Sequence, residues 1–253
     1  MTEKHPLIVQ KYGGSSLASS DHVIRVARHI VERKKTGCDL VVVASAMGKT
    51  TDNLIKLAHE MNPNPDLREM DMLLSVGEQI SISALSLAVQ FLGFKAKSFT
   101  GSQVGIYTDT RHSRGRIQSI NPAKIKQALA DDYIVIIAGF QGCTKEGEIT
   151  TLGRGGSDTT AVALAAVLDA EYCEIMSDID GIYNADPKKV MAAKRLDRID
   201  YDQALEMASS GARMLHKHSV EFAKQHGIKL SLGSSMSGKI GTIVSDTGLA
   251  QES

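Results

Sequence analysis

The sequence predicts an α/β protein with a mainly parallel β-sheet and helices on both of its faces. Short β-branched apolar runs recur along the chain, at residues 7–12, 40–46, 133–140 and 172–178. Such runs are typical of strands that are buried on both faces of a parallel sheet. Segments with the apolar spacing of helices separate them, which is the order expected of βαβ units.

The first βαβ unit is the clearest in the sequence. "LIVQKY" (residues 7–12) and "LVVVASA" (residues 40–46) predict its two strands. The intervening segment has apolar residues at i, i+3, i+4, i+7 and i+8, the pattern of an amphipathic helix: Val23, Val26, Ala27, Ile30 and Val31. Ser20 or Asp21 can cap the start of this helix and Gly37 its end. The crossover is expected to be right-handed.

The later segments repeat the same alternation. "YIVIIAGF" (residues 133–140) and "YCEIMSD" (residues 172–178) each follow a helical segment and predict two further strands. Between them, "CTKEGEITT" predicts a β-hairpin that turns at residues 145–147. "NPNPD" (residues 62–66) is the only proline-rich break, and it is too short for a domain linker.

Composition excludes several classes of protein. The 253 residues include 29 Lys plus Arg and 29 Asp plus Glu, so no overall basic field attracts nucleic acid or a membrane surface. Three widely spaced cysteines indicate reduced thiols of a cytoplasmic protein. We expect no membrane span, because no apolar run approaches ~18 residues, and no signal peptide. The eight histidines lack ligand spacing, so we expect no metal site built by the protein alone.

Glycine-rich polar loops follow the predicted strands. Ligands of open α/β sheets bind beyond the carboxyl ends of the strands, and the loops there read "KYGGSS", "SAMGKTTD", "GRGGSDTT" and "SDIDGIYNADP". Glycine lets backbone N–H groups approach an anion closely, and Lys11 adds a full positive charge. These loops predict a phosphorylated ligand beside a second polar ligand.

Each loop by itself is a weak signal. "GKTTD" lacks the spacing of a Walker A loop, and "GRGGSD" lacks the Rossmann spacing, which disfavours an NAD-dependent oxidoreductase. Glu78 could be a surface helix residue and Arg154 a structural ion-pair residue. His216 and His218 diverge on a helix because they are two residues apart, so we interpret them as solvated or core histidines.

The combination of motifs is more specific than any one of them. In chain order they are "KYGGSS", "SAMGKTTD", "LLSVGEQIS", "GFQG", "TTLGRGGSDTTAVALAA", "SDIDGIYNADP" and "SVEFAKQHGI". From about Leu7 to about Val244, the chain resembles the catalytic domain of aspartate kinases, in the amino-acid kinase family. The resemblance implies one open αβα sandwich with about eight mainly parallel strands.

It also implies a domain organisation. A single kinase domain is expected over residues 1–245, with an amino-acid-binding lobe at about 1–168 and a nucleotide-binding lobe at about 169–245. Residues 246–253 form a short polar tail, and no ACT regulatory domain is expected in the chain.

The reaction implied by the resemblance is transfer of a phosphoryl group from ATP to the side-chain carboxylate of L-aspartate. The product, 4-phospho-L-aspartate, leads towards lysine, threonine and methionine. Since a carboxylate is already nucleophilic at neutral pH, catalysis should consist of positioning and electrostatics. The resemblance implies Lys11 and Asp158 as catalytic residues. It implies a substrate site made of Ser45, Thr51, Glu78, Arg154, Gly155, Gly156 and Ser157.

The ATP site follows from the same resemblance, as do the partners. Its expected residues are Lys11, Tyr12, Gly13, Gly14, Ser177, Asp178, Tyr183, Asn184, Ala185, Asp186, Pro187 and Arg213. Mg²⁺ is expected to be carried with ATP. A homodimer is expected, with a separate regulatory chain as a further possibility. "GARMLHK" departs from the family pattern "GAKVLHP", which leaves the role of Arg213 open.

Two alternatives stay open at this point. One is an amino-acid kinase that acts on another carboxylate, such as glutamate or acetylglutamate. Arg154 together with Glu78 favours a free α-amino acid, because an acylated nitrogen would leave a buried carboxylate unpaired. The other is a non-catalytic nucleotide-binding module, which would be expected to have lost Lys11 or Asp158.

Overall fold

A computed structural model describes residues 5–185, 190–209 and 216–246. Its main sheet has eight strands in the order β12-β14-β13-β9-β1-β2-β6-β3. They are β1 (Leu7–Tyr12), β2 (Asp39–Ala44), β3 (Ala96–Phe99), β6 (Ile134–Ala138), β9 (Tyr172–Ser177), β12 (Arg198–Ile199), β13 (Leu230–Ser234) and β14 (Ile240–Val244). All pairs are parallel except β13 with β14. The predicted α/β class and the strand number are confirmed.

The centre of the sheet is where sequence patterns were strongest. The four predicted strands appear as β1, β2, β6 and β9, with ends within two residues of those expected. β1 lies between β2 and β9, and Lys11 is in register with Val43 and Ile175. Because these strands run the same way, their carboxyl ends and the loops that follow share one edge of the sheet.

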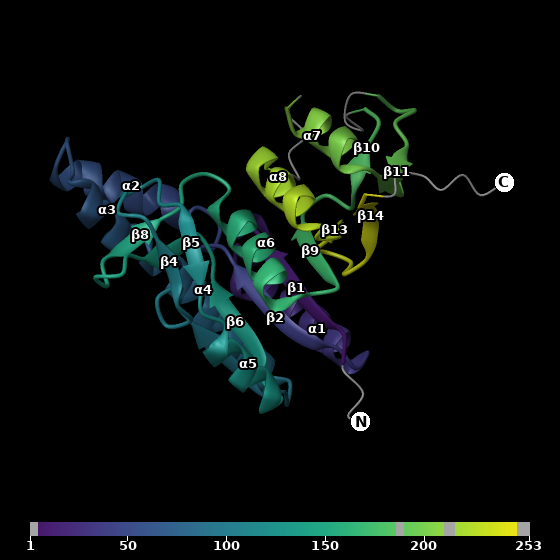
Figure 1. The fold of residues 1–253 in the computed structure, drawn as a ribbon, viewed down its shortest axis with the longest axis horizontal. Helices are drawn as coiled ribbons and strands as arrows, with labels where there is room; N and C mark the ends of the chain where they lie inside the picture. Colours follow the sequence, from purple (N-terminus) through teal and green to yellow (C-terminus); the bar gives the residue numbers. More distant parts are fainter. Residues whose placement is uncertain (1–4, 186–189, 210–215, 247–253) are drawn as a thin grey trace.

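Helices cover both faces of the sheet (Figure 1). On one face, α5 (Ala123–Ala130), α6 (Gly156–Leu168), α7 (Tyr201–Ser209) and α8 (Lys217–His226) enclose the larger apolar core. On the other face, α1 (Ser20–Lys35) and α4 (Val76–Phe91) enclose a second core. Burial of these two layers is the main stabilising contribution to the fold.

The ends of α1 differ slightly from the prediction. Ser19 caps the start, because its Oγ accepts a hydrogen bond from the His22 amide at 3.4 Å, whereas Ser20 and Asp21 lie inside the first turn. Thr36 is the C-cap residue, and Gly37 follows with φ +83°, as expected of a glycine just past a helix end.

Smaller elements extend the fold at the carboxyl edge. β4 (Ile106–Thr108), β5 (Ile117–Ile120), β7 (Gln141–Cys143) and β8 (Ile149–Thr151) form a four-stranded sheet, and β10 (Ile182–Tyr183) pairs with β11 (Arg195–Leu196). β7 and β8 are the predicted hairpin, which turns through Gly147 at φ +92°. The remaining helices are η1 (Gly14–Leu17), α2 (Thr50–Met61) and α3 (Leu67–Leu74).

One helical stretch corrects the expectation about apolar segments. Leu67–Phe91, which contains α3 and α4, is long and apolar enough to cross a membrane, with a mean hydropathy of 1.5. Half of its most apolar window is buried inside the protein, where α4 packs on β3, β6 and α1. That burial is the behaviour of a core helix in a globular fold. The three cysteines are free and buried.

Candidate active site

The carboxyl edge of the sheet brings two of the predicted site residues into direct contact. Lys11 lies near the end of β1, and its Nζ is 2.6 Å from Oδ1 of Asp158, which is in the first turn of α6. Both side chains are largely buried. The partial positive charge at the start of α6 also favours a carboxylate there. Asp158 therefore fixes the position of the lysine ammonium at the sheet edge.

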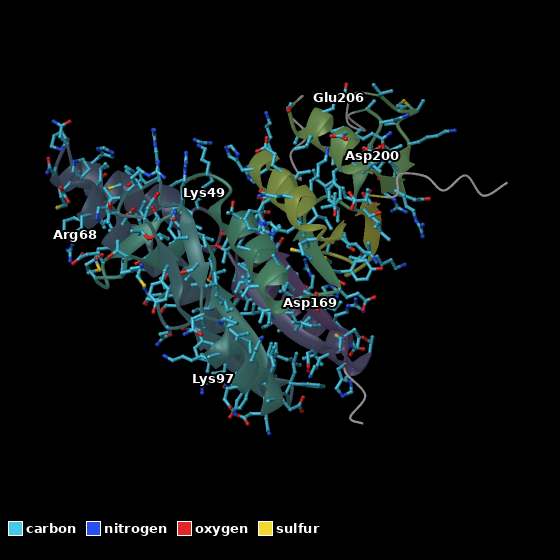
Figure 2. The ribbon with its side chains drawn as sticks, viewed as in Figure 1. Lys49, Arg68, Lys97, Asp169, Asp200 and Glu206 are labelled. Carbon is cyan, nitrogen blue, oxygen red and sulfur yellow. The ribbon has the colours of Figure 1, made fainter. Side chains whose placement is uncertain are left out.

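Figure 2 shows on which side of the molecule this edge of the sheet lies. Lys49, at the start of α2, lies on the side of the carboxyl ends, whereas Lys97 of β3 and Asp169, after α6, lie towards the opposite edge (Figure 2). The described residues that were predicted for the site lie at the carboxyl ends of strands, in the loops that follow them or in the first turns of helices.

The loops after β1 and β2 are in direct contact. The Gly48 amide donates to the Gly14 carbonyl at 2.9 Å, and the Ser45 amide donates to the Tyr12 carbonyl at 3.0 Å. A Cβ on Gly14 would lie 2.7 Å from the carbonyl oxygen of Ala46, which is too close for any side chain. Glycine at position 14 is thus required for the approach of the two loops.

Glu78 is the most unusual ionisable group of the site. It lies in the first turn of α4, is 3% exposed, and its Oε1 accepts a hydrogen bond from the Ala46 amide at 3.0 Å. Its Oε2 is buried and has no hydrogen-bond partner among the described residues. Burial raises the pKa of this carboxyl to about 7, although the Ala46 bond opposes the shift. A cation at Oε2 would relieve the cost of this unpaired oxygen.

Arg154 lies in the loop between β8 and α6, with glycines on both sides. Gly153 and Gly155 each have φ +76°, which L-amino acids with side chains rarely adopt. The guanidinium is exposed, and it forms no hydrogen bond or ion pair within the described parts of the chain. Arg154 is therefore available to bind an anionic group.

The other predicted substrate residues lie in the loop after β2 and in the first turns of α2 and α6. Ser157 packs closely on Gly139 after β6, since a Cβ on that glycine would be 2.7 Å from the serine Oγ. Gly156 packs against Leu152 in the same way. Ser45 and Thr51 are half-buried in the loop after β2 and in the first turn of α2.

His216 belongs to this site, although the sequence pattern did not indicate it. Its Nε2 is 3.7 Å from Oδ2 of Asp158, and a Cβ on Gly155 would be 2.6 Å from its ring. His216 is half-exposed, which agrees with the interpretation of a solvated histidine, but its contact with Asp158 was not predicted. The contact joins residues 58 positions apart, so helical spacing around His216 could not reveal it.

The predicted nucleotide residues lie at the ends of β9 and β10. Ser177 ends β9, and its carbonyl accepts hydrogen bonds from the amide and the hydroxyl of Ser235 at 2.7 and 2.9 Å. The hydroxyl of Ser16 donates to that of Ser235 at 2.7 Å, which connects the segment after β1 to the segment after β13. This serine cluster was missed, because its members are far apart in the sequence.

The turn after β9 is held by its own polar groups. The Tyr183 hydroxyl donates to Asp180 at 2.9 Å, and Oδ1 of Asn184 accepts from the Lys194 amide at 2.8 Å. Asp178 is exposed and Ala185 is half-buried. The predicted ATP residues Asp186, Pro187 and Arg213 lie outside the described residues.

Tyr12 requires a correction. Its ring is fully buried in the core under α1 and α4, so its side chain cannot line an ATP site at the sheet edge. Successive residues of a strand point to opposite faces, and Lys11 faces α6. Only the backbone of Tyr12 reaches the loops, through its bond with Ser45.

A buried carboxylate outside the predicted set supports the loop that follows β8. Asp71 of α3 is fully buried and accepts hydrogen bonds from His112, from the amide and hydroxyl of Ser113, and from Thr151. Ser113 has φ +61°, an uncommon conformation for serine. Since Thr151 ends β8, Asp71 anchors the loop that carries Arg154.

The described residues contain no cluster of three or more His, Cys, Asp or Glu side chains that could hold a metal ion. Asp158 lies beside the candidate phosphate loop, because it contacts Lys11, whose Nζ would be 3.5 Å from a Cβ on Gly13. One carboxylate suits Mg²⁺ that arrives with a nucleotide, because such Mg²⁺ takes most of its ligands from phosphates and water.

Comparison with known proteins identifies relatives of this chain. An aspartokinase of Mycolicibacterium smegmatis is 51% identical over 239 residues, which are 94% of this chain and 57% of the relative. An aspartokinase of Thermus thermophilus is 48% identical over 97% of this chain and 61% of its own length. The chain thus spans about three fifths of the length of these relatives.

Solved structures share the fold. Aspartate kinase from Synechocystis has a TM-score of 0.85 at 48% identity, over 96% of this chain and 40% of that chain. E. coli aspartokinase III in complex with aspartate and ADP has a TM-score of 0.86 at 28% identity, over 96% and 65%. Carbamate kinase from Giardia lamblia, at 15% identity and a TM-score of 0.71, shares the fold alone.

The family model described as the amino acid kinase family matches residues 6–234. These residues include every strand of the main sheet except β14 and every described residue predicted for the site. The chain therefore belongs to the amino acid kinase family.

Proposed function

We propose that this chain carries the catalytic site of an aspartate kinase, which transfers the γ-phosphoryl group of ATP to the side-chain carboxylate of L-aspartate. The relatives named aspartokinase and the related structure with aspartate and ADP support this assignment. The observation that carries it is Glu78, a buried carboxylate with one unpaired oxygen. Such a group suits a substrate with a free ammonium.

Two charged groups would select the amino acid. Glu78 would hold the α-ammonium of aspartate, and the exposed guanidinium of Arg154 would bind its α-carboxylate, since guanidinium geometry suits bidentate contact with a carboxylate. Ser45, Thr51 and Ser157 would add hydroxyl contacts, and Gly155 and Gly156 would bring the backbone close. With both α-groups bound, the side-chain carboxylate is the part of aspartate left to react.

The reaction needs no general base. An oxygen of the side-chain carboxylate forms a bond to the γ-phosphorus of ATP, the bond from that phosphorus to the β–γ bridging oxygen breaks, and ADP leaves with the electron pair. Lys11 would neutralise charge on the transferring group, and Asp158 would hold Lys11 in place through their 2.6 Å contact. Gly13 and Gly14 would offer backbone N–H groups to the phosphates.

The nucleotide would bind over residues of the carboxyl-terminal lobe, at about 169–245, and the amino acid over those at about 1–168. Ser177, Asp178, Tyr183 and the segment 184–187 would surround the adenosine, with Arg213 as a further candidate. Mg²⁺ bound to ATP would offset phosphate charge, with Asp158 as a candidate carboxylate ligand. A cytoplasmic location, a homodimer and a separate regulatory chain stay predictions.

The assignment is tested by trapping the acyl phosphate. The purified chain is incubated with ATP, Mg²⁺ and hydroxylamine, with L-aspartate, L-glutamate or N-acetyl-L-glutamate as acceptor, and the hydroxamate is measured. Hydroxamate from L-aspartate alone is expected. A greater yield from L-glutamate or N-acetyl-L-glutamate would reassign the substrate, and no yield from any acceptor, with ATP still bound, would indicate a nucleotide-binding module.

A further inference from the structure

Asp71 is a fully buried carboxylate that the proposed reaction does not use. It lies in α3 and has no exposed surface. Its Oδ1 accepts a hydrogen bond from the Thr151 hydroxyl at 2.5 Å, and both of its oxygens accept from the Ser113 amide, at 3.0 and 2.9 Å. The Ser113 hydroxyl, at 3.3 Å, and the His112 ring, at 2.9 Å, are further donors. A buried carboxylate is costly unless it is hydrogen-bonded, so these contacts favour one position of the group.

Thr151 is held through its backbone as well. Its carbonyl accepts a hydrogen bond from the Gly115 amide at 2.8 Å, in the same loop as Ser113. Gly153 also lies against that loop, since a Cβ on it would be 3.4 Å from the Ser113 carbonyl oxygen. Arg154 comes three residues after Thr151. The backbone that leads to Arg154 is thus attached to α3 through the buried carboxylate.

A second hydrogen bond joins the same two parts of the protein. Gln141 of β7 is paired with Thr151 of β8, and its Nε2 donates to the Ser75 carbonyl at 2.8 Å. Ser75 is both the C-cap residue of α3 and the N-cap residue of α4. The β7–β8 hairpin is therefore attached to the α3–α4 corner at two points, the carboxylate of Asp71 and the carbonyl of Ser75.

These attachments relate the positions of Glu78 and Arg154. Glu78 follows Ser75 by three residues, as Arg154 follows Thr151. In the proposed site, Glu78 would bind the α-ammonium of aspartate and Arg154 its α-carboxylate. The two groups are bonded to one carbon atom, so their separation is fixed. Binding is strongest when the two charges of the site are held at a matching separation.

We propose that Asp71 is a positioning residue that sets the separation between Glu78 and Arg154, and through it the selection of L-aspartate. This inference rests on the proposed function. Asp71 does not touch the substrate and acts through Thr151. A displacement of about 1 Å in an active site can lower the rate by ~10²-fold. Loss of the Thr151 contact should therefore weaken the binding of aspartate and leave that of ATP unchanged.

The first test is steady-state kinetics of the 253-residue chain with varied L-aspartate and with varied ATP. Asp71→Asn keeps the shape of the side chain but replaces one acceptor oxygen by a donor, and Thr151→Val removes only the hydroxyl. Both variants should raise KM for aspartate by ~10–100-fold and change KM for ATP by less than about twofold. Thr151→Ser keeps the hydroxyl, so its KM for aspartate should stay near that of the wild type.

Glu174→Gln is the matched control. Glu174 is another buried carboxylate, 3% exposed, and it joins distant parts of the chain by accepting hydrogen bonds from Gln10 and Arg33. These partners belong to β1 and α1, and not to the loop that carries Arg154. Its replacement should lower stability, as that of Asp71 does, but leave KM for aspartate unchanged.

A second readout reports the geometry of the site and not its stability. D-aspartate carries the same charged groups as L-aspartate in the mirror-image arrangement. Discrimination between the two therefore depends on the relative positions of the groups that bind them. The ratio of Ki for D-aspartate to KM for L-aspartate should fall by ~10-fold or more in Asp71→Asn and Thr151→Val. Glu174→Gln should keep the wild-type ratio, even though it is less stable.

Hydrogen exchange, measured by mass spectrometry, tests the loop without any substrate. The amides of residues 152–157 should exchange faster by ~10-fold or more in Asp71→Asn and Thr151→Val, and at the wild-type rate in Glu174→Gln and Thr151→Ser. Circular dichroism checks that each variant is folded. If Asp71→Asn does not fold, the pair Thr151→Val and Thr151→Ser decides the question.

Several results would overturn the proposal. An unchanged KM for aspartate in folded Asp71→Asn and Thr151→Val removes the positioning role. An equal rise in Glu174→Gln would show that lost stability alone is the cause. An equal rise in KM for aspartate and KM for ATP would exclude an action on the amino-acid site alone.

Failure of the proposed function gives a different result. In that case the wild type forms no hydroxamate with any acceptor, and the assignment of the substrate is wrong. The exchange comparison does not depend on kinase activity, so it still decides whether Asp71 holds the loop that carries Arg154.

Discussion

Glu78 should make the binding of aspartate depend on pH near neutrality. The proposed ammonium contact requires the ionised carboxylate, and burial raises the pKa of Glu78 to about 7 in the empty site. The ionised fraction of a group with this pKa falls from ~0.9 at about pH 8 to ~0.1 at about pH 6. The apparent dissociation constant is the intrinsic constant divided by the competent fraction. KM for aspartate should therefore rise roughly ninefold over this range.

The sign of the effect follows from the direction of the shift. A raised carboxyl pKa means that the empty site holds a proton below about pH 7, and the substrate ammonium must displace it. The α-carboxylate, the ammonium and the side-chain carboxylate of aspartate keep their charges over the range tested. The pH dependence of KM for aspartate therefore reports the titration of Glu78 and not that of the substrate.

The assay measures ADP release at saturating ATP while aspartate is varied at a series of pH values, and KM for ATP serves as an internal control. Glu78→Gln removes the titrating group, so its KM for aspartate should be ~10–100-fold higher at pH 8 and nearly independent of pH. A constant KM for aspartate in the wild type would refute the reasoning. The same slope in Glu78→Gln would also refute it, because another group would then be responsible.

Four further outcomes are expected. Lys11→Met should lower kcat by ~10²–10³ with the fold intact by circular dichroism, because it removes one cation from the transferring phosphoryl group; near-normal turnover in a folded variant would contradict this role. Arg154→Ala should raise KM for aspartate much more than KM for ATP in steady-state kinetics, and the reverse would place Arg154 in the nucleotide site. Asp71→Asn should lower the free energy of unfolding in urea by ~1–3 kcal/mol, because an amide cannot accept all the hydrogen bonds that this buried carboxylate accepts; an unchanged midpoint would exclude an anchoring role. Without ligands, Glu78→Gln should be more stable than the wild type by up to ~3 kcal/mol at pH 8, as measured by urea denaturation. The raised pKa of Glu78 stabilises the folded wild type below about pH 4.5, and this stabilisation is lost as the pH rises through about 7. The difference in stability between the two proteins should therefore disappear below about pH 4.5.

The sheet could be predicted because its central strands are buried on both faces. Runs such as "LVVVASA" are typical of strands that are buried on both faces of a sheet, and the alternation of these runs with helical segments predicts the α/β class. The short strands β10, β11 and β12 could not be predicted, because they contain two residues each and depend on partners far away in the sequence.

The candidate site could be proposed from the sequence where its chemistry is local. Lys11, Glu78, Arg154 and Asp158 stand within motifs, and the structure places Lys11 near the end of β1 and the other three in a loop or in first turns of helices. His216 and Asp71 were missed because their contacts depend on the fold. His216 reaches Asp158 across 58 residues, and Asp71 meets Thr151 across 80.

Ala46 packs three of these separate motifs against one another. Its amide donates to Glu78, and its carbonyl lies against Gly14 so closely that a Cβ there would be at 2.7 Å. A Cβ on Gly77 would likewise lie 2.8 Å from the Cβ of Ala46. The loop after β2 is therefore packed between the proposed ammonium site on α4 and the proposed phosphate loop after β1. Neither glycine can be replaced without moving this loop. The backbone therefore sets the separation between the proposed ammonium site and the proposed phosphate loop, and the charged side chains are held in place by that backbone.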